Sequence, residues 1–216
     1  MHLITDETVL HAAAKHLSAR DKVLAKLIKT HGISRMQPWA SDPFSSLIDA
    51  IIGQQLSVKA ANTIGDRVLK IAGRGKRFVA SKLLSADEDE LRACGLSGAK
   101  SRYVQAVARA VIVKDIDLKK VQRMDDEQAL KALTALNGVG KWTAEMLMIF
   151  AYGHADILSL GDWGLRRGAQ MAYQLAEPPN DKVFIGMAEI WRPYRSVASW
   201  YLWRAAEGNA AVSSAG

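Results

Sequence analysis

Residues 136–144 (LNGVGKWTA) have the composition of an anion-binding turn. Gly138 and Gly140 flank a single apolar residue, which allows a turn tight enough to expose backbone N–H groups. The helix expected after the turn would add the positive end of its dipole, and Lys141 would add a charge beside it. A phosphate group could bind there. An ordinary glycine turn between two packed helices is the alternative. A dinucleotide-binding loop is excluded, because no strand precedes the turn and no third glycine follows at the required offset.

Asp162 is the second candidate for chemistry. It lies 22 positions after Gly140 and precedes the helical segment WGLRRGAQMAYQL. The N-terminus of a helix favours a negative charge, so an ionised carboxylate there could stabilise positive charge that develops during a reaction. Asp162 could equally be a plain N-cap that contributes about 1 kcal/mol to stability. The two roles are compatible.

The composition limits the class of protein. Lys and Arg number 29 against 22 Asp and Glu, which gives a net charge of +7 among 216 residues. This excess favours a polyanionic partner, such as nucleic acid or an anionic membrane surface, without deciding between them. A single cysteine, Cys94, excludes an intramolecular disulfide, a four-cysteine iron–sulfur cluster and a cysteine-rich zinc site.

The chain shows no targeting or membrane signal. Its N-terminus breaks apolar residues with charges, and no stretch approaches ~20 uninterrupted apolar residues. We therefore expect no membrane partner and a reducing location: the cytoplasm, close to the nucleoid, or the nucleus in a eukaryote. The five histidines show no metal-ligand spacing, so no metal site built from side chains is expected.

The elements that must position these residues are helices. Apolar residues recur with helical spacing almost everywhere, and no alternating strand of five or more residues is present, which predicts an all-α fold of nine or ten helices. No linker divides the chain, so we expect one domain over 1–216 with a loose tail from about 208. Residues 85–88 (SADE) have capping-box spacing. Other helix-start signals lie at Asp42-Pro43, Ser57, Ser97, Asp125 and Asp162.

Residues 129–152 resemble the helix–hairpin–helix DNA-binding motif, whose pattern is Leu-Pro-Gly-Val/Ile-Gly-x-x-Thr-Ala. Asn137 stands where proline is usual, and both glycines are intact. In the DNA glycosylase superfamily built on this motif, an essential aspartate follows the hairpin at a spacing that Asp162 matches. Three further segments resemble the DNA-3-methyladenine glycosylase II family: DPFSSLIDAIIGQQLSVKAA, GLSGAKSRYV and WRPYRSVASWYLW. The resemblance covers most of the chain, in the compact form without the N-terminal β domain of larger members.

This resemblance implies a two-lobed helical bundle with the hairpin motif and an active site in the cleft between the lobes. It implies a base-excision repair enzyme that flips alkylated purines, such as 3-methyladenine and 7-methylguanine, out of duplex DNA and hydrolyses their N-glycosidic bond. A purine alkylated at a ring nitrogen already carries positive charge and leaves without being protonated. One carboxylate, Asp162, could then suffice to stabilise the oxocarbenium-like sugar.

The position of Trp142 separates two kinds of glycosylase. Bifunctional glycosylase/lyases of the superfamily place a lysine here, two residues after the second glycine, to form a Schiff base. Trp142 replaces that lysine and Lys141 is one residue off, so we expect hydrolysis without strand cleavage. Two alternatives remain open: a non-catalytic helix–hairpin–helix module that only binds DNA, and a glycosylase for oxidised or mismatched bases.

The resemblance also assigns roles around Asp162. Gln55 is the candidate wedge that fills the gap left by the flipped base, with Leu56 beside it and Ser57 near the minor groove. Met146 stands where some members have tyrosine, which leaves the base preference open. The expected base pocket is Trp142, Trp203, Tyr194, Met146 and Trp163, whose electron-rich rings would attract a cationic purine. The expected contacts to the DNA backbone are Gly138, Gly140, Lys141, Thr143, Lys100 and Arg166.

The only cofactor expected is a monovalent cation, Na⁺ or K⁺, which the hairpins of this superfamily can hold on backbone carbonyls. The carbonyls here would be those of Thr134, Leu136 and Val139. The expected partner is duplex DNA that contains alkylated bases, and we expect a monomer because no apolar stripe exceeds what the core needs.

Overall fold

Side chains at helix starts determine where most of the helices begin. The computed structural model describes residues 4, 6–34, 36 and 42–213. Asp42 precedes Pro43 at the start of a helix and accepts hydrogen bonds from two backbone N–H groups of its first turn. Ser57, Ser97, Asp125 and Asp162 cap four further helices in the same way. The predicted helix starts at these residues are confirmed.

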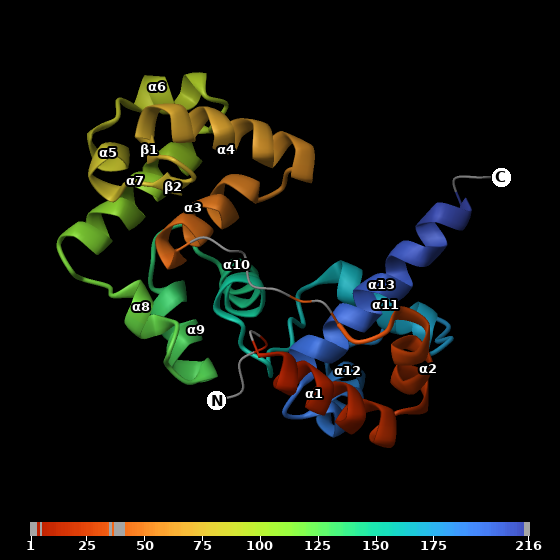
Figure 1. Ribbon diagram of the computed structural model, residues 1–216. Helices are drawn as coiled ribbons and strands as arrows, with labels where there is room; N and C mark the ends of the chain where they lie inside the picture. The colour runs from red at the N-terminus through yellow and green to blue at the C-terminus, as the bar shows by residue number, and fades with distance from the viewer. Residues whose placement is uncertain (1–3, 5, 35, 37–41, 214–216) are drawn as a thin grey trace. The chain divides into compact units, whose positions relative to one another are not determined.

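The chain divides into two units, of which unit 1 comprises residues 1–38 and 153–216 and unit 2 comprises residues 39–152. Within unit 2, α3 is central, since its leucine and isoleucine residues from Leu47 to Ile52 are buried and it packs against α4, α7 and α10 (Figure 1). The elements of unit 2 are α3 (Pro43–Gly53), α4 (Val58–Ala72), β1 (Gly73–Arg74), β2 (Arg77–Phe78), α5 (Ala80–Ser85), α6 (Glu88–Ala93), α7 (Gly98–Ile112), α8 (Leu118–Val121), α9 (Asp126–Thr134), α10 (Lys141–Leu147) and the π-helix η1 (Met148–Tyr152).

Unit 1 is built around the packing of α11 on α13. Gly168 makes this contact close, because a Cβ at that position would lie 2.1 Å from the backbone oxygen of Leu202. Trp191, Phe184 and Tyr201 are fully buried in this unit. Its elements are α1 (Glu7–Arg20), α2 (Lys22–His31), α11 (Trp163–Ala172), α12 (Asp181–Ala188), the 3₁₀-helix η2 (Glu189–Trp191) and α13 (Arg195–Ser213).

The all-α prediction is confirmed, but the number of helices was too low. The described part of the chain contains thirteen α-helices, and its strands are only the two-residue antiparallel pair β1–β2. Four- and six-residue helices such as α8 and α5 are too short to show a helical period in the sequence. None of the described helices is long and apolar enough to cross a membrane.

One local prediction was wrong. Ser85 is not a capping-box residue: it ends α5, and its hydroxyl donates to the Lys82 carbonyl. The box is formed two residues later by Asp87 and Glu90, which bind each other's backbone N–H groups at the start of α6. α13 continues to Ser213, and the loose tail expected from about 208 stays a prediction. Residues 214–216 lie outside the described part.

Candidate functional site

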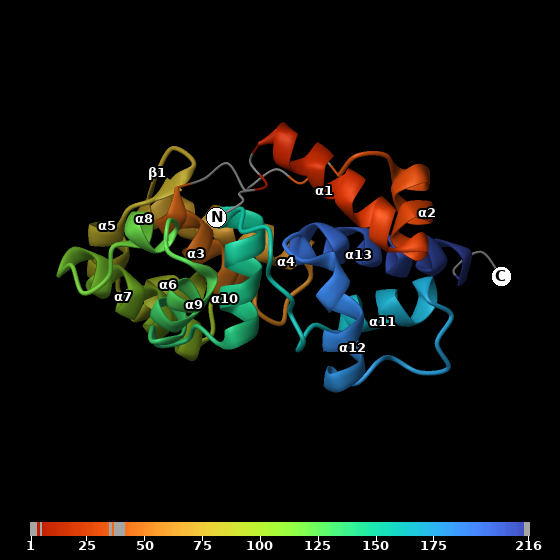
Figure 2. The ribbon, with the colours of Figure 1, turned by 90° about the horizontal axis from the view of Figure 1, so that it is seen from below.

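The predicted hairpin connects α9 to α10, and these helices lie side by side in both ribbon views (Figures 1 and 2). The N–H of Val139 donates to the carbonyl of Leu136 at 3.1 Å and closes the turn. Gly138 has a φ of +86°, and a Cβ there would lie 2.2 Å from Cγ of Tyr103. Glycine is therefore required at 138 both by the backbone conformation and by the packing of Tyr103.

Gly140 has a different role in the same turn. Its φ of −75° is ordinary, and a Cβ there would meet no atom within 4 Å. It is the N-cap of α10 and provides no side-chain oxygen to the first-turn N–H groups. Such a helix start is suited to binding an anion from outside the protein. A groove of about 790 Å³ runs along it, lined by Gln54, Gln55, Tyr103, residues 134–140, Trp142 and Thr143.

The loop after α3 is joined to the hairpin by Gln54. Its side-chain amide donates to the Gly138 carbonyl at 2.9 Å and to the Thr143 hydroxyl at 3.1 Å. Sequence analysis did not assign a role to Gln54. The side chain of Thr143 is thereby buried against the protein, so any contact of Thr143 with DNA would come from its backbone N–H.

The three candidate wedge residues lie at the tip of this loop. Gln55 is exposed, has a φ of +57° and lines the groove beside the hairpin. Leu56 is 40% exposed, so its apolar side chain is available to contact a partner. Ser57 caps α4 by accepting from the Ala60 N–H. This geometry is compatible with a wedge at Gln55 and Leu56.

Lys100, a predicted DNA-backbone contact, has another role. Its ammonium group donates to the carbonyls of Ile52 and Gln54, both at 2.7 Å, at the C-terminal end of α3. Partial burial lowers the pKa of Lys100. Lysine commonly binds the last carbonyls of a helix in this way, so Lys100 supports the wedge loop, and its contact with DNA stays a prediction.

The exposed face of α10 carries the pocket residues of unit 2. Trp142 is 45% exposed, Met146 is buried, and both line a second groove of about 790 Å³ with Phe150 one further turn along. Lys141, which precedes Trp142, lies 3.9 Å from the carboxylate of Glu145 in an i,i+4 ion pair. Lys141 is largely exposed and remains available to a phosphate.

Asp162 lies at the start of α11 in unit 1, as predicted, and is 9% exposed. Its Oδ1 accepts hydrogen bonds from the Leu165 N–H at 2.6 Å and from the indole Nε1–H of Trp203 at 3.0 Å. Gly164 leaves room for this pair, because a Cβ there would lie 3.3 Å from the same oxygen. The carboxylate is thus oriented by one donor on its own helix and one on α13.

The other three predicted residues of unit 1 differ in environment. Trp163 is 64% exposed beside Asp162, whereas Tyr194 is buried and packs edge-on against His16, with ring centroids 5.3 Å apart. The guanidinium of Arg166 donates to the carbonyls of Leu160 and Pro179 and pairs with Asp181. Arg166 thus orders the loops at both ends of α11, and its contact with DNA stays a prediction.

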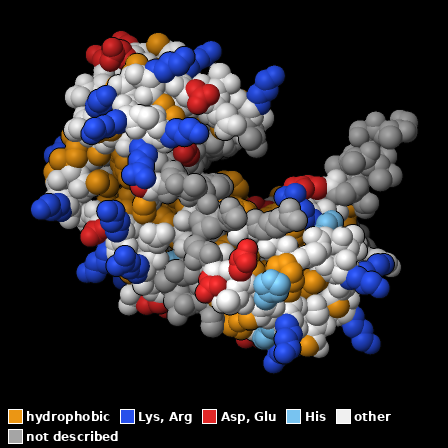
Figure 3. Space-filling view, viewed as in Figure 1, with side chains coloured by type: hydrophobic (Ala, Val, Ile, Leu, Met, Phe, Trp, Pro, Cys, Tyr) orange, Lys and Arg blue, Asp and Glu red, His pale blue; other side chains and the backbone are white. Residues whose placement is uncertain are grey.

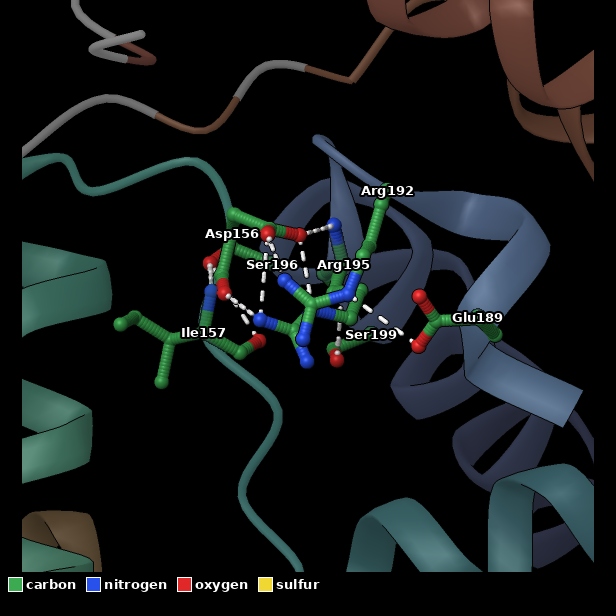
Figure 4. Close-up of polar contacts among 7 residues, drawn as sticks. All are labelled: Asp156, Ile157, Glu189, Arg192, Arg195, Ser196 and Ser199. Atoms are coloured by element: carbon green, nitrogen blue, oxygen red, sulfur yellow. Dashed lines mark hydrogen bonds and ion pairs between the residues drawn. The ribbon is translucent and has the colours of Figure 1, made fainter. Parts of the chain in front are cut away.

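A polar network anchors the segment that leads to Asp162 (Figure 4). Arg195, in the first turn of α13, binds the Asp156 carboxylate through Nε at 2.7 Å and Nη2 at 3.0 Å, and Arg192 binds it at 2.9 Å. The hydroxyl of Ser196 accepts from the Ile157 N–H at 2.9 Å. The same helix thus holds the approach to Asp162 through its first turn and orients the carboxylate through Trp203.

The predicted cation ligands all lie in the groove at the hairpin. The Leu136 carbonyl accepts the Val139 N–H, which leaves it one further lone pair. Backbone carbonyls are oxygen ligands suited to a monovalent cation, so the residues present fit such an ion. Over the described ranges, no group of three or more acidic, histidine or cysteine side chains could hold a metal.

The distribution of positive charge can be followed on one face of the molecule (Figure 3). On the face seen in Figure 3, lysine and arginine side chains are spread over the surface rather than gathered in one patch. The net charge of +7 therefore does not locate a DNA-binding surface. The hairpin and its groove are better evidence for one, since they combine backbone conformation, a helix start and an opening.

Comparisons with known proteins agree with this site. The family model described as HhH-GPD superfamily base excision DNA repair protein matches residues 48–193, which include both the hairpin and Asp162. DNA-3-methyladenine glycosylase 1 of Schizosaccharomyces pombe is 33% identical over 200 residues, covering 91% of this chain and 88% of that protein.

Two solved structures are similar over nearly the whole chain. The 3-methyladenine DNA glycosylase Mag1 of Schizosaccharomyces pombe, in complex with abasic DNA, has a TM-score of 0.80 and 32% identity, covering 89% of this chain and 95% of that one. A DNA-3-methyladenine glycosidase of Bacillus halodurans has a TM-score of 0.82 and 36% identity, covering 92% and 90%. This chain belongs to the HhH-GPD superfamily of base excision DNA repair proteins.

Proposed function

We propose that this protein is a DNA glycosylase that hydrolyses the N-glycosidic bond of alkylated purines in duplex DNA. The observation that carries the proposal is the pairing of Asp162 with Trp203: a largely buried carboxylate at a helix start, oriented by an indole N–H. The names of the similar proteins, DNA-3-methyladenine glycosylase 1 and DNA-3-methyladenine glycosidase, support the same activity and the same class of base.

Asp162 would act on the sugar. As the bond between C1′ and the purine nitrogen breaks, its electrons leave with the base and positive charge develops on the deoxyribose. A fixed carboxylate stabilises that charge without reorganising, and water then adds to C1′ and loses a proton. An N-alkylated purine leaves as a neutral base, because it takes up the bonding electrons while already carrying a positive charge. No second carboxyl group is needed to protonate it.

The reaction would end at an abasic site without strand cleavage. Trp142 has no amine to form a Schiff base. The neighbouring Lys141 is one residue away from the position of the lysine in bifunctional members and lies 3.9 Å from the carboxylate of Glu145. Both observations support the monofunctional reaction.

The partner would be DNA, held by its backbone at the hairpin and opened by the wedge loop. Mag1 of Schizosaccharomyces pombe was solved with abasic DNA, which supports DNA as the partner here. The start of α10 would bind a phosphate, and Gln55 and Leu56 would fill the gap left by the flipped nucleotide. We further propose a monomer that needs no organic cofactor, holds one monovalent cation at the hairpin and works inside the cell where the DNA lies.

One assay tests the activity. The protein is incubated with duplex DNA that carries a single 7-methylguanine, and released base is measured before and after alkali. Free base with strand breaks only after alkali is the expected result. Breaks without alkali would refute the monofunctional reaction. DNA binding without any base release would favour a non-catalytic module, and release restricted to oxidised or mismatched bases would favour the other alternative.

A further inference from the structure

The second groove of unit 2 is acidic, although the protein as a whole is basic. One wall is the face of α10 and η1 that carries Trp142, Met146 and Phe150. The lining residues from α3 and α4 include two carboxylates, Asp49 and Asp66. We call this cavity of about 790 Å³ the acidic groove. Aromatic rings and two carboxylates in the lining of one cavity are a combination that suits a flat cation.

Neither carboxylate is neutralised by the protein. In the ranges that the structure describes, Asp49 and Asp66 form no ion pair and no side-chain hydrogen bond, although the chain has seven more basic than acidic residues. Asp49 closely approaches α4, since a Cβ at Gly65 would lie 3.7 Å from its Oδ1. Both side chains are exposed, so water screens part of the repulsion between their two negative charges, and a positive group in the groove would reduce it further.

The electrostatics of Asp49 reflect this cost. Asp49 keeps contact with water, but the protein atoms around it displace part of its hydration shell. This desolvation, together with the negative charges of Asp42 and Asp66, raises the pKa of Asp49 to about 6. At neutral pH the carboxylate is mostly ionised at a free-energy cost, which a bound cation would relieve.

We propose that the acidic groove selects the positive charge of the damaged base, with Asp49 and Asp66 as specificity-determining residues and Trp142 as the stacking surface. This inference rests on the proposed function and names the property of the substrate that the protein reads. Undamaged purines are neutral and gain nothing from the two carboxylates, whereas an N-alkylated purine is attracted to them. The same carboxylates repel phosphates, so the DNA backbone is kept at the hairpin and out of the groove.

Removing the two charges tests the proposal. The double variant Asp49→Asn/Asp66→Asn keeps the shape of both side chains. Single-turnover release of 7-methylguanine, which is cationic in DNA, should fall about fivefold, while release of neutral hypoxanthine changes by less than about twofold. Asp115→Asn is the matched control, because Asp115 is an exposed acid of unit 2 outside the groove, and it should leave both rates unchanged. Equal loss for both lesions, or no loss for either, overturns the proposal.

A binding measurement separates this inference from the proposed function. Quenching of tryptophan fluorescence is titrated at pH 7.5 with 1-methyladenosine, a cation at this pH, and with neutral adenosine. The wild-type protein and Asp115→Asn should bind the cation about fivefold more tightly, and the double variant should bind the two alike. A wild-type protein that shows this preference but releases no base from DNA would refute the proposed function alone. A wild-type protein that releases base but binds both nucleosides equally would refute only the proposal that the acidic groove selects a cationic base.

Discussion

Two helix starts, one in each unit, are built from the same local device and differ in one side chain. α10 begins at Gly140, which has no side chain to satisfy the first-turn N–H groups, whereas α11 begins at Asp162, whose carboxylate binds the Leu165 N–H. The first is suited to receive an anion from a partner, and the second presents an anion of its own. A capping position can therefore serve binding or catalysis. It serves binding where a ligand satisfies the first-turn N–H groups, and catalysis where the protein's own carboxylate does so.

The largest effect is expected at Asp162. Asp162→Asn should lower single-turnover base release by at least about 100-fold, because the amide cannot stabilise a sugar cation by its charge. The melting temperature should hardly change, since asparagine caps a helix as well as aspartate does. Asp162→Ala should lose the same activity and in addition about 1 kcal/mol of stability. Full activity in Asp162→Asn would show that Asp162 only caps the helix, and the functional difference between Asp162 and Gly140 would be refuted.

The next effect concerns the two glycines of the hairpin. Gly138→Ala should cost about 2–3 kcal/mol, because alanine must adopt a φ of +86° and its Cβ overlaps Tyr103. Gly140→Ala should change stability by less than about 0.5 kcal/mol, as its Cβ meets no atom. Chemical denaturation of both variants tests this. If Gly140→Ala were as unstable as Gly138→Ala, packing against Tyr103 would not explain why glycine is required at position 138.

The affinity for duplex DNA further distinguishes the roles of Gly138 and Gly140. A folded Gly140→Ala protein should still bind duplex DNA several-fold more weakly, because a methyl group at the helix start obstructs an approaching phosphate. Electrophoretic mobility shifts at fixed salt would measure this. Unchanged affinity would place the phosphate elsewhere on the hairpin groove.

Much of this comparison was predictable, because caps and glycine turns act locally. Asp162, Ser57, Ser97 and Asp125 each precede an apolar helical run and bind N–H groups within three residues, so the sequence contains the whole interaction. The hairpin was equally recognisable from Gly138 and Gly140.

Contacts between distant segments were not predictable. Lys100 and Arg166 are cations, and the sequence does not reveal that both bind backbone carbonyls. Gln54 and Gln55 are identical neighbours, and only the φ of +57° at Gln55 and the position of the hairpin decide which one turns inward. The close approach of Gly168 to Leu202, which brings Trp203 to Asp162, also depends on packing between separate helices.

A smaller effect is expected from the donor that orients Asp162. Trp203→Phe keeps an aromatic ring but removes the Nε1–H that donates to Oδ1 at 3.0 Å. Base release should fall up to about tenfold, because one hydrogen bond to a charged group is lost while the cap bond from Leu165 remains. Trp200→Phe is a suitable control on the same helix, since Trp200 packs against Tyr201. Equal losses in both variants would point to general packing of α13.

The smallest effect separates the two glutamines of the wedge loop. Gln54→Leu should destabilise the protein by about 1 kcal/mol, because it removes the partly buried hydrogen bonds to the Gly138 carbonyl and the Thr143 hydroxyl. It should also weaken DNA binding a few-fold, since the hairpin loses a support while its backbone conformation is kept by Gly138.

Gln55→Leu should leave the melting temperature unchanged, because that side chain is exposed. Its effect should instead appear in base release from duplex DNA and be weaker for a lesion placed opposite a mismatch, where less pairing must be broken. If Gln54→Leu and Gln55→Leu exchanged these phenotypes, the assignment of one glutamine to support and the other to the DNA would be reversed.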